Sequence, residues 1–219
     1  MSNSIIFNNE NICIFPNIVL SLQYQENQEV MTTSIYKTSD YLTTDEIHRL
    51  IRYFKRLGNH QMELLIEFGV KTLLRYSDLS RIKWEDVIGR ETLVLNEKKT
   101  NKRREITLGR SIRERIEMVH NQLGNPNNDE YIFNYSLQYV NRLLKEGGKD
   151  VKIRNKNIST HSMRKSGSRF IWENNGHSDE YLIKLSSILN HSSTFITRKY
   201  LGISKEEIKN IYESFDELL

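Results

Sequence analysis

Five polar side chains stand at the borders of apolar segments, where a buried helix face ends or begins. Arg75 directly follows one apolar run, and His191 closes another. His161 and Arg164 open a third segment, and their three-residue spacing places them on one face of a helix. Tyr200 follows His191 by nine residues. Arginine binds anionic oxygens, histidine transfers protons near neutral pH, and tyrosine can act as a nucleophile.

A basic turn is predicted between the first arginine and the histidines. Residues 92–95 and 104–108 have the β-prone composition of strands, and the segment that joins them carries Lys98, Lys99 and Lys102. The sequence therefore predicts a β-hairpin with a charged tip. Taken singly, each of these residues is ordinary, because a lone histidine is usually structural and a lone arginine usually covers apolar surface.

Taken together, the residues resemble the pattern of the tyrosine recombinases, the family of lambda-type integrases and Xer proteins. That pattern is Arg, Lys, His-x-x-Arg, His or Trp, and Tyr, and all six positions are filled here. The matching segments follow the family order over residues 42–219, about four fifths of the chain. They are residues 74–79, 99–104, 161–166, 189–193 and 197–200.

The resemblance implies a DNA strand transferase with six catalytic residues, namely Arg75, Lys99, His161, Arg164, His191 and Tyr200. Tyr200 would attack the DNA phosphate and form a 3′-phosphotyrosyl link, with no cofactor. A tyrosine phenol has an ordinary pKa near 10, so attack at neutral pH needs a base and strong stabilisation of the anion.

The resemblance also assigns roles to the other five residues. Arg75 and Arg164 would donate to the non-bridging phosphate oxygens, with His191 as a further donor. His161 is the expected base for the tyrosine proton. Lys99 aligns with the family's hairpin lysine and would protonate the departing 5′ oxygen. Its neighbours Lys98 and Lys102 lie close enough in the sequence to compete for that role.

The distribution of charge favours duplex DNA as the partner. The formal net charge is +4, but residues 1–40 carry −3 and the remainder therefore +7. Bases concentrate in residues 98–116 and 142–165, which suits phosphate binding, although a solvated face is the alternative explanation of charge alone. The expected DNA contacts are Lys98, Lys102, Arg103, Arg104 and Lys165.

Other classes of site are disfavoured. The six histidines show no HxxxH or HxH spacing, Cys13 has no partner cysteine, and no glycine-rich phosphate loop is present, so neither a metal nor ATP is implied. No apolar run approaches the roughly 18 residues of a membrane span, and the amino terminus lacks a signal-peptide pattern. We expect a cytoplasmic protein without membrane contact.

The predicted fold class is α+β, mainly helical with one small antiparallel sheet. A helix capped by Thr43 or Thr44 and a second, strongly apolar helix precede the hairpin, and the remaining helices follow it. Residues 41–219 are the expected catalytic domain. Expected helices cover 44–57, 62–74, 112–123, 136–146, 160–174, 178–190 and 204–218.

Residues 1–40 are polar and too few for the separate core-binding domain that this family usually carries. We interpret them as an arm or linker. The isolated chain is therefore expected to discriminate little between DNA sequences, and an accessory protein stays open as a partner. The family's Thr-Gly-Leu before the first arginine is Thr72-Leu73-Leu74 here, and Asn190 replaces the usual glycine before the second histidine.

The last segment carries an apolar stripe at helical spacing: Ile208, Ile211, Tyr212, Phe215, Leu218 and Leu219. It either packs on its own domain or, as the resemblance implies, docks on a neighbouring subunit in a homo-oligomer on DNA. Residues 202–204 are expected to act as a short linker before it. Two other functions stay open: a type IB topoisomerase-like strand transferase, and a non-catalytic DNA-binding regulator with this fold.

Overall fold

The computed structural model describes residues 38–217, so the expectation for residues 1–40 falls almost wholly outside the described part. The compact unit that contains the described residues begins at Thr38. The Asp40 backbone N–H donates to the Asn157 carbonyl at 2.9 Å, which ties the first described residues to the loop before the His-x-x-Arg helix.

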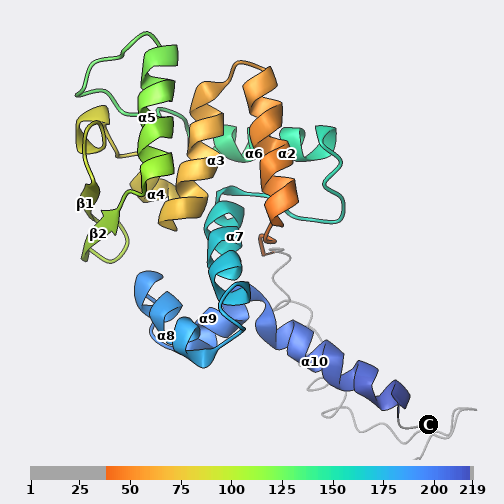
Figure 1. Cartoon of the computed structure of the whole chain (residues 1–219). Helices are drawn as coiled ribbons and strands as arrows, with labels where there is room; N and C mark the ends of the chain where they lie inside the picture. Colours follow the sequence, from red (N-terminus) through yellow and green to blue (C-terminus); the bar gives the residue numbers. More distant parts are fainter. Residues whose placement is uncertain (1–37, 218–219) are drawn as a thin grey trace, which may run out of the picture. The chain divides into compact units, whose positions relative to one another are not determined.

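The described chain is mostly helical with one two-stranded antiparallel sheet, which confirms the predicted α+β class (Figure 1). The strands pair from Thr92 opposite Thr107 to Asn96 opposite Arg103. The elements are α2 (Thr44–Arg56), α3 (His60–Thr72), α4 (Tyr76–Leu79), η1 (Trp84–Asp86), β1 (Thr92–Asn96), β2 (Arg103–Thr107), α5 (Arg110–Gln122), α6 (Leu137–Asp150), α7 (Thr160–Glu173), α8 (Asp179–Ile188), α9 (Thr194–Leu201), α10 (Ile203–Ser214) and η2 (Phe215–Glu217).

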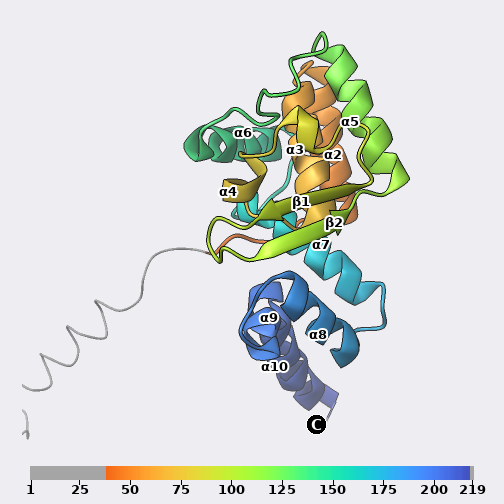
Figure 2. The ribbon, with the colours of Figure 1, turned by 90° about the vertical axis from the view of Figure 1, so that its left-hand side faces the viewer.

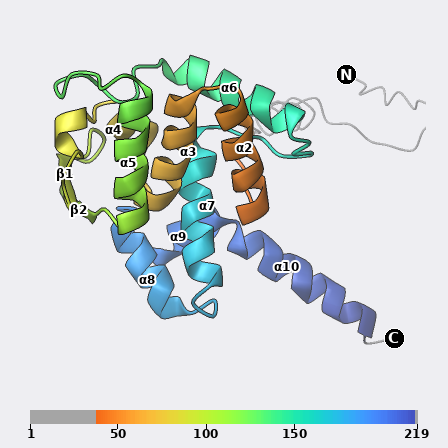
Figure 3. The ribbon, with the colours of Figure 1, turned by 45° about the horizontal axis from the view of Figure 1, so that its top comes forward.

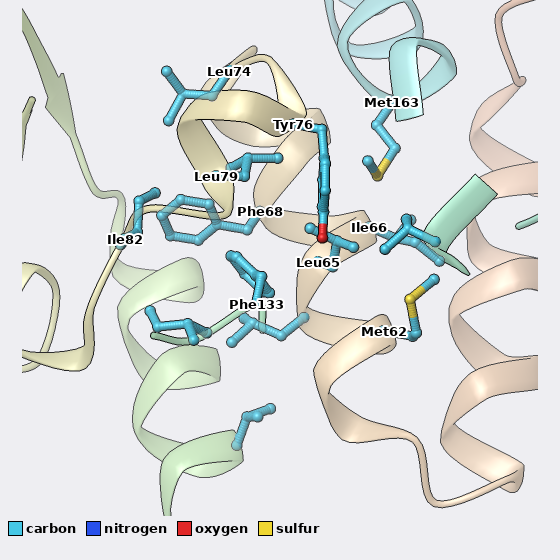
Figure 4. Packing of buried hydrophobic residues seen from close by; sticks show 14 of the residues in the cluster. Met62, Leu65, Ile66, Phe68, Leu74, Tyr76, Leu79, Ile82, Phe133 and Met163 are labelled. Carbon is cyan, nitrogen blue, oxygen red and sulfur yellow. The ribbon is translucent and has the colours of Figure 1, made fainter. Parts of the chain in front are cut away.

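The larger hydrophobic core surrounds α3, which lies among α2, α5 and α7 (Figure 3). Phe68 of α3 packs against Phe133 with ring centroids 6.0 Å apart, in the cluster drawn in Figure 4. Tyr76 completes this packing and donates its hydroxyl to the Tyr135 carbonyl at 2.7 Å. The buried partner satisfies a polar group that would otherwise destabilise the core.

Side-chain caps fix where the helices start. Thr43 and Glu46 form a capping box at α2, which decides between the two threonines that the sequence offered. Asn59 caps α3, and Ser159 caps α7. Because the cap sets the first turn, Ser159 fixes the place of the His-x-x-Arg residues on α7.

A second, smaller core joins α8, α9, the start of α10 and the end of α7. It contains Leu182, Leu185, Leu189, Leu201 and Ile203. Figures 1 and 2 show α7 reaching from the larger helix group to this smaller one. Side chains in the middle of α7 therefore lie between the two cores.

Gly167 allows α7 to cross α3 at very short range. A Cβ placed on Gly167 would lie 2.1 Å from the Val70 carbonyl oxygen and 2.6 Å from a methyl of Leu73. Only a glycine fits such an approach without moving the backbone. The contact sets the position of Arg164, one turn earlier on α7.

Several expected boundaries need correction. No helix or strand is predicted from the sequence for the segment that carries Tyr200, and residues 194–201 form α9, capped by Ser193. Residues 202–204 are not a linker. Gly202, at φ 80°, is the single residue between helices α9 and α10, and the buried residue Ile203 already begins α10. Helix α6 continues to Asp150 through two buried glycines, which pack closely against neighbouring side chains. None of the helices in the described range is long and apolar enough to cross a membrane.

Candidate active site

Two arginines meet at one backbone carbonyl between the two cores. Leu73 adopts φ 55°, a left-handed conformation that ends α3 and changes the direction of the chain just before Arg75. Arg75 donates from Nη1 to Glu97 Oε2 at 3.0 Å and from Nη2 to the Leu189 carbonyl at 3.4 Å. Arg164 is 2% exposed and donates to the same Leu189 carbonyl at 2.7 Å and to the Leu73 carbonyl. The two guanidinium groups are therefore held side by side.

The two predicted histidines both face this cationic pair. Partial desolvation, then the charges of Arg164, Arg75 and Lys99, lower the pKa of His161 below its ordinary value of 6.5. The same causes, with burial first, lower the pKa of His191 to about 4. Both rings are therefore neutral at pH 7, so His161 can accept a proton and His191 has one N–H to donate.

His191 is oriented by a short loop after α8. Asn190 adopts φ 52°, the left-handed conformation that the sequence suggested for this position. The His191 ring places Nδ1 3.0 Å from Thr197 Oγ1 of α9. Its ring lies edge-on to Tyr200, with centroids 5.2 Å apart at 75°. The histidine thus links the α8–α9 loop to the helix that carries the predicted nucleophile.

Acidification from pH 6.5 to about pH 4 is expected to destabilise the fold through His191. The folded protein favours the neutral ring, whereas the unfolded chain takes up a proton near pH 6.5. The stabilisation is therefore complete above pH 6.5 and is lost as the pH falls towards 4. Urea unfolding at several pH values should show a weaker pH dependence for His191→Asn than for the wild type. Exposed His48→Asn is the control, and identical pH dependence in all three proteins would contradict this attribution.

Tyr200 presents a buried hydroxyl to the arginine pair. No contact within residues 38–217 meets full hydrogen-bond geometry, but Arg164 is close enough to lower the pKa of Tyr200 both by its charge and as a hydrogen-bond donor. Burial outweighs that effect and raises the pKa of Tyr200 to about 12. A buried hydroxyl whose hydrogen bonds are incomplete is unusual in a folded protein and marks a place where a ligand oxygen can complete them.

The hairpin brings its basic turn to the same place. Lys99 is exposed on the turn between β1 and β2, and its charge reaches both His161 and His191. Lys98 and Lys102 are also exposed, and the Lys98 backbone N–H donates to buried Asp78 at 2.7 Å. Of these three lysines, Lys99 is the one whose charge lowers the pKa of both histidines.

The remaining predicted DNA contacts differ in exposure. Arg103 is exposed and paired with Glu105 at 2.8 Å. Lys165 lies 5.8 Å from the centre of the Tyr200 ring. Arg104 points inward instead, donating to Glu97 at 3.2 Å and to the Thr72 carbonyl at 2.8 Å, with its side chain 12% exposed. The Arg104 guanidinium therefore makes contacts within the fold, whereas the charge pattern of the sequence had predicted a contact with DNA.

Sequence reasoning missed Glu97, which lies at the centre of this arrangement. Its side chain is fully buried and accepts hydrogen bonds from Arg75 and Arg104. A charged residue that follows a strand and lies close to three lysines is expected to be exposed to solvent. No local sequence pattern therefore identifies Glu97 as buried. Within residues 38–217 no three His, Cys, Asp or Glu side chains gather as a metal site would need.

The comparisons with known proteins agree with this geometry. The model of the phage integrase family matches residues 40–207. The chain belongs to the phage integrase family. That result confirms the predicted family, its enzyme class of tyrosine recombinases, and the fold.

Relatives of this phage integrase family chain include "Probable integrase/recombinase YoeC" of Bacillus subtilis, 28% identical over 181 residues, which cover 80% of this chain and 94% of that protein. "Tyrosine recombinase XerD" of Staphylococcus aureus is 25% identical over 82% of this chain, which spans 63% of its length.

Among solved structures, XerA recombinase matches with a TM-score of 0.62 and 20% identity over 82% of this chain and 66% of that one. A lambda integrase dimer bound to a COC' core site matches with a TM-score of 0.57 and 21% identity over 84% of this chain and 70% of that one. At these identities the structural likeness establishes the fold alone.

Proposed function

We propose that this chain cleaves and rejoins duplex DNA through a 3′-phosphotyrosyl intermediate, with Tyr200 as the nucleophile. The observation that carries the proposal is the buried Tyr200 hydroxyl, which lies beside Arg164 and Arg75, two arginines that share the Leu189 carbonyl. A phosphodiester placed there would meet an attacking oxygen and two cationic donors at once.

The chemical steps follow from the groups around that hydroxyl. Tyr200 Oη bonds to phosphorus while the bond from phosphorus to the 5′ oxygen breaks. His161, neutral at pH 7, takes the phenol proton, and Lys99 gives a proton to the 5′ oxygen. Arg75 and Arg164 neutralise the non-bridging oxygens, and attack by a 5′-hydroxyl reverses the sequence and rejoins the strand.

A covalent-capture experiment tests this proposal. A pool of nicked duplexes of random sequence lets the short 5′-hydroxyl fragment diffuse away after cleavage, so that the protein–DNA adduct accumulates. Denaturing gels, peptide mapping and sequencing of the trapped DNA should give an adduct at Tyr200 and a preferred site. Absence of any adduct would favour a non-catalytic regulator. An adduct accompanied by relaxation of supercoiled plasmid, with no strand exchange, would favour the topoisomerase alternative.

The hairpin turn is expected to supply phosphate contacts. Replacing the exposed bases Lys98, Lys102 and Arg103 with Gln should reduce the slope of log affinity against log salt by roughly 0.9 for each lost phosphate contact, and by about 3 at most. The control is the triple variant Lys83→Gln, Lys184→Gln, Lys209→Gln, which changes the net charge equally. Fluorescence anisotropy with a labelled duplex measures both, and equal slopes would remove the hairpin from the interface.

Helix α10 is expected to assemble subunits on DNA, and the similar lambda integrase structure is a dimer bound to a core site. Its described apolar side chains are unpacked: Ile208, Ile211, Tyr212 and Phe215 are 55%, 57%, 69% and 55% exposed. These exposures support docking on a neighbouring subunit over packing on its own domain, the other alternative left by the sequence. Leu218 and Leu219 lie outside the described part. In Figures 1 and 3, α10 projects away from the preceding helices.

The double variant Ile211→Glu, Phe215→Glu is expected to bind DNA but to lose assembly. Because both side chains are exposed, stability should change by about 0.5 kcal/mol or less. Analytical ultracentrifugation on a duplex with two sites measures the assembly, and Lys209→Glu on the same helix is the control. Unchanged assembly with a melting temperature lowered by several degrees would show that α10 packs within its own subunit.

A further inference from the structure

Glu97 is a buried carboxylate with four side-chain partners. Its Oε2 accepts from Arg75 at 3.0 Å, from Thr100 at 2.9 Å and from Asn190 at 2.8 Å, and its Oε1 accepts from Arg104 at 3.2 Å. Its side chain has no exposed surface. Burying an ion of this kind is unfavourable unless its partners satisfy it fully, so the arrangement is a specific one.

The partners of Glu97 come from three of the five segments that carry predicted catalytic groups. Arg75 follows α3, Thr100 lies in the hairpin turn next to Lys99, and Asn190 immediately precedes His191. The backbone of Glu97 also closes the turn, since its N–H donates to the Lys102 carbonyl at 3.0 Å and its carbonyl accepts from the Asn101 N–H at 2.8 Å. One side chain thus joins segments far apart in the sequence.

The carboxylate is ionised when it makes these contacts. Burial acts to raise the pKa of Glu97, but hydrogen bonds from Thr100 and Asn190 and the charge of Arg75 lower it below its ordinary value. Arg75 is therefore paired with an anion on one side. On the other side its charge acts on His161, His191 and Tyr200.

We propose that Glu97 is a positioning residue of this active site, which holds the Arg75 guanidinium in the orientation that meets the scissile phosphate. The inference rests on the proposed function, because it concerns the phosphate that Tyr200 attacks. Arg164 is held differently, by the carbonyls of Leu73 and Leu189. Without Glu97, Arg75 keeps only its longer contact with the Leu189 carbonyl, at 3.4 Å, so its guanidinium should become mobile while Arg164 stays in place.

A Glu97→Gln variant tests, without any DNA, whether Glu97 holds the Arg75 guanidinium in place. An amide offers one acceptor oxygen and turns an N–H₂ group towards a guanidinium, so Arg75 loses its charged partner. Arginine side-chain NMR of the wild type should show restricted guanidinium rotation for both Arg75 and Arg164. In the variant the Arg75 signals should become those of a freely rotating group while those of Arg164 persist. Unchanged Arg75 signals would overturn the proposal.

A comparison of two DNA substrates tests whether Glu97 acts on the scissile phosphate through Arg75. On the site recovered by covalent capture, one duplex carries a normal scissile phosphate and another a methylphosphonate, which lacks the negative charge. If Glu97 acts through Arg75, Glu97→Gln should slow adduct formation on the order of 10²-fold with the charged phosphate and less than about 10-fold with the neutral one. An equal loss on both substrates would overturn the proposal.

The matched control is Glu63→Gln, which alters a second buried carboxylate, paired with Arg115 and His60 of the larger core. It should lower stability and affect both substrates equally. Should Glu97→Gln not fold, Glu97→Asp keeps the charge with a shorter side chain and should show the same substrate preference more weakly. A wild-type protein that forms no adduct would reject the proposed function, while the NMR result would still decide whether Glu97 positions Arg75.

Discussion

A Tyr200→Phe variant is expected to form no covalent adduct with DNA, a loss on the order of 10⁴-fold or more, while it binds duplex DNA as the wild type does. The substitution removes the attacking oxygen and leaves the exposed bases of the hairpin in place. Because the Tyr200 hydroxyl makes no hydrogen bond of full geometry in the described part and has Arg164 as its neighbouring donor, its removal should change the free energy of unfolding by about 1 kcal/mol or less.

Three measurements check this expectation: adduct formation on denaturing gels, duplex affinity by anisotropy, and thermal unfolding. Tyr181→Phe and Tyr212→Phe are the matched controls, since these two tyrosines lie on α8 and α10 near the same helix group. Both should retain the adduct. An adduct formed by Tyr200→Phe but lost in one of the controls would identify a different nucleophile. A large drop in melting temperature would show that the hydroxyl has a structural partner.

Gly167→Ala is expected to produce the largest loss of stability among single-methyl changes in this chain. The new Cβ would lie 2.1 Å from the Val70 carbonyl oxygen, which is backbone and cannot rotate away. Helices α3 and α7 must separate, at a cost of about 3 kcal/mol, which lowers the melting temperature by roughly 6–12 °C for a domain of this size. The shift also moves Arg164, so adduct formation should decline in any folded fraction.

Alanine substitutions at two other glycines provide a comparison for this loss of stability. A Cβ on Gly109 meets nothing within 4 Å, so Gly109→Ala should be nearly neutral. A Cβ on Gly148 would meet the end of the Ile158 side chain at 2.4 Å, and that flexible group can move, so the loss should be intermediate. Thermal unfolding of the three variants gives the order directly. Equal stability of Gly167→Ala and Gly109→Ala would show that α7 can shift without consequence.

The family, the fold class and the positions of the predicted catalytic residues could be inferred from the amino-acid sequence. These depend on short-range patterns that can be read along the chain. The capping threonine before α2, the alternation of the hairpin strands and the three-residue spacing of His161 and Arg164 are local features, and the structure contains each of them. The left-handed conformation of Asn190 could likewise be anticipated from its residue type.

The contacts and the burial of those residues depend on the packing of distant segments and could not be inferred from the sequence. Glu97 and Arg104 look like surface charges in the sequence, and they become an internal ion pair because segments far apart in the chain enclose them. The same enclosure sets the pKa of His191 near 4 and that of Tyr200 near 12, since desolvation depends on every element packed around a group. Helix α9 is short and rich in β-branched residues, so its local preference is weak. Contacts of Leu201 in the second core stabilise it and thereby fix Tyr200 beside the arginines.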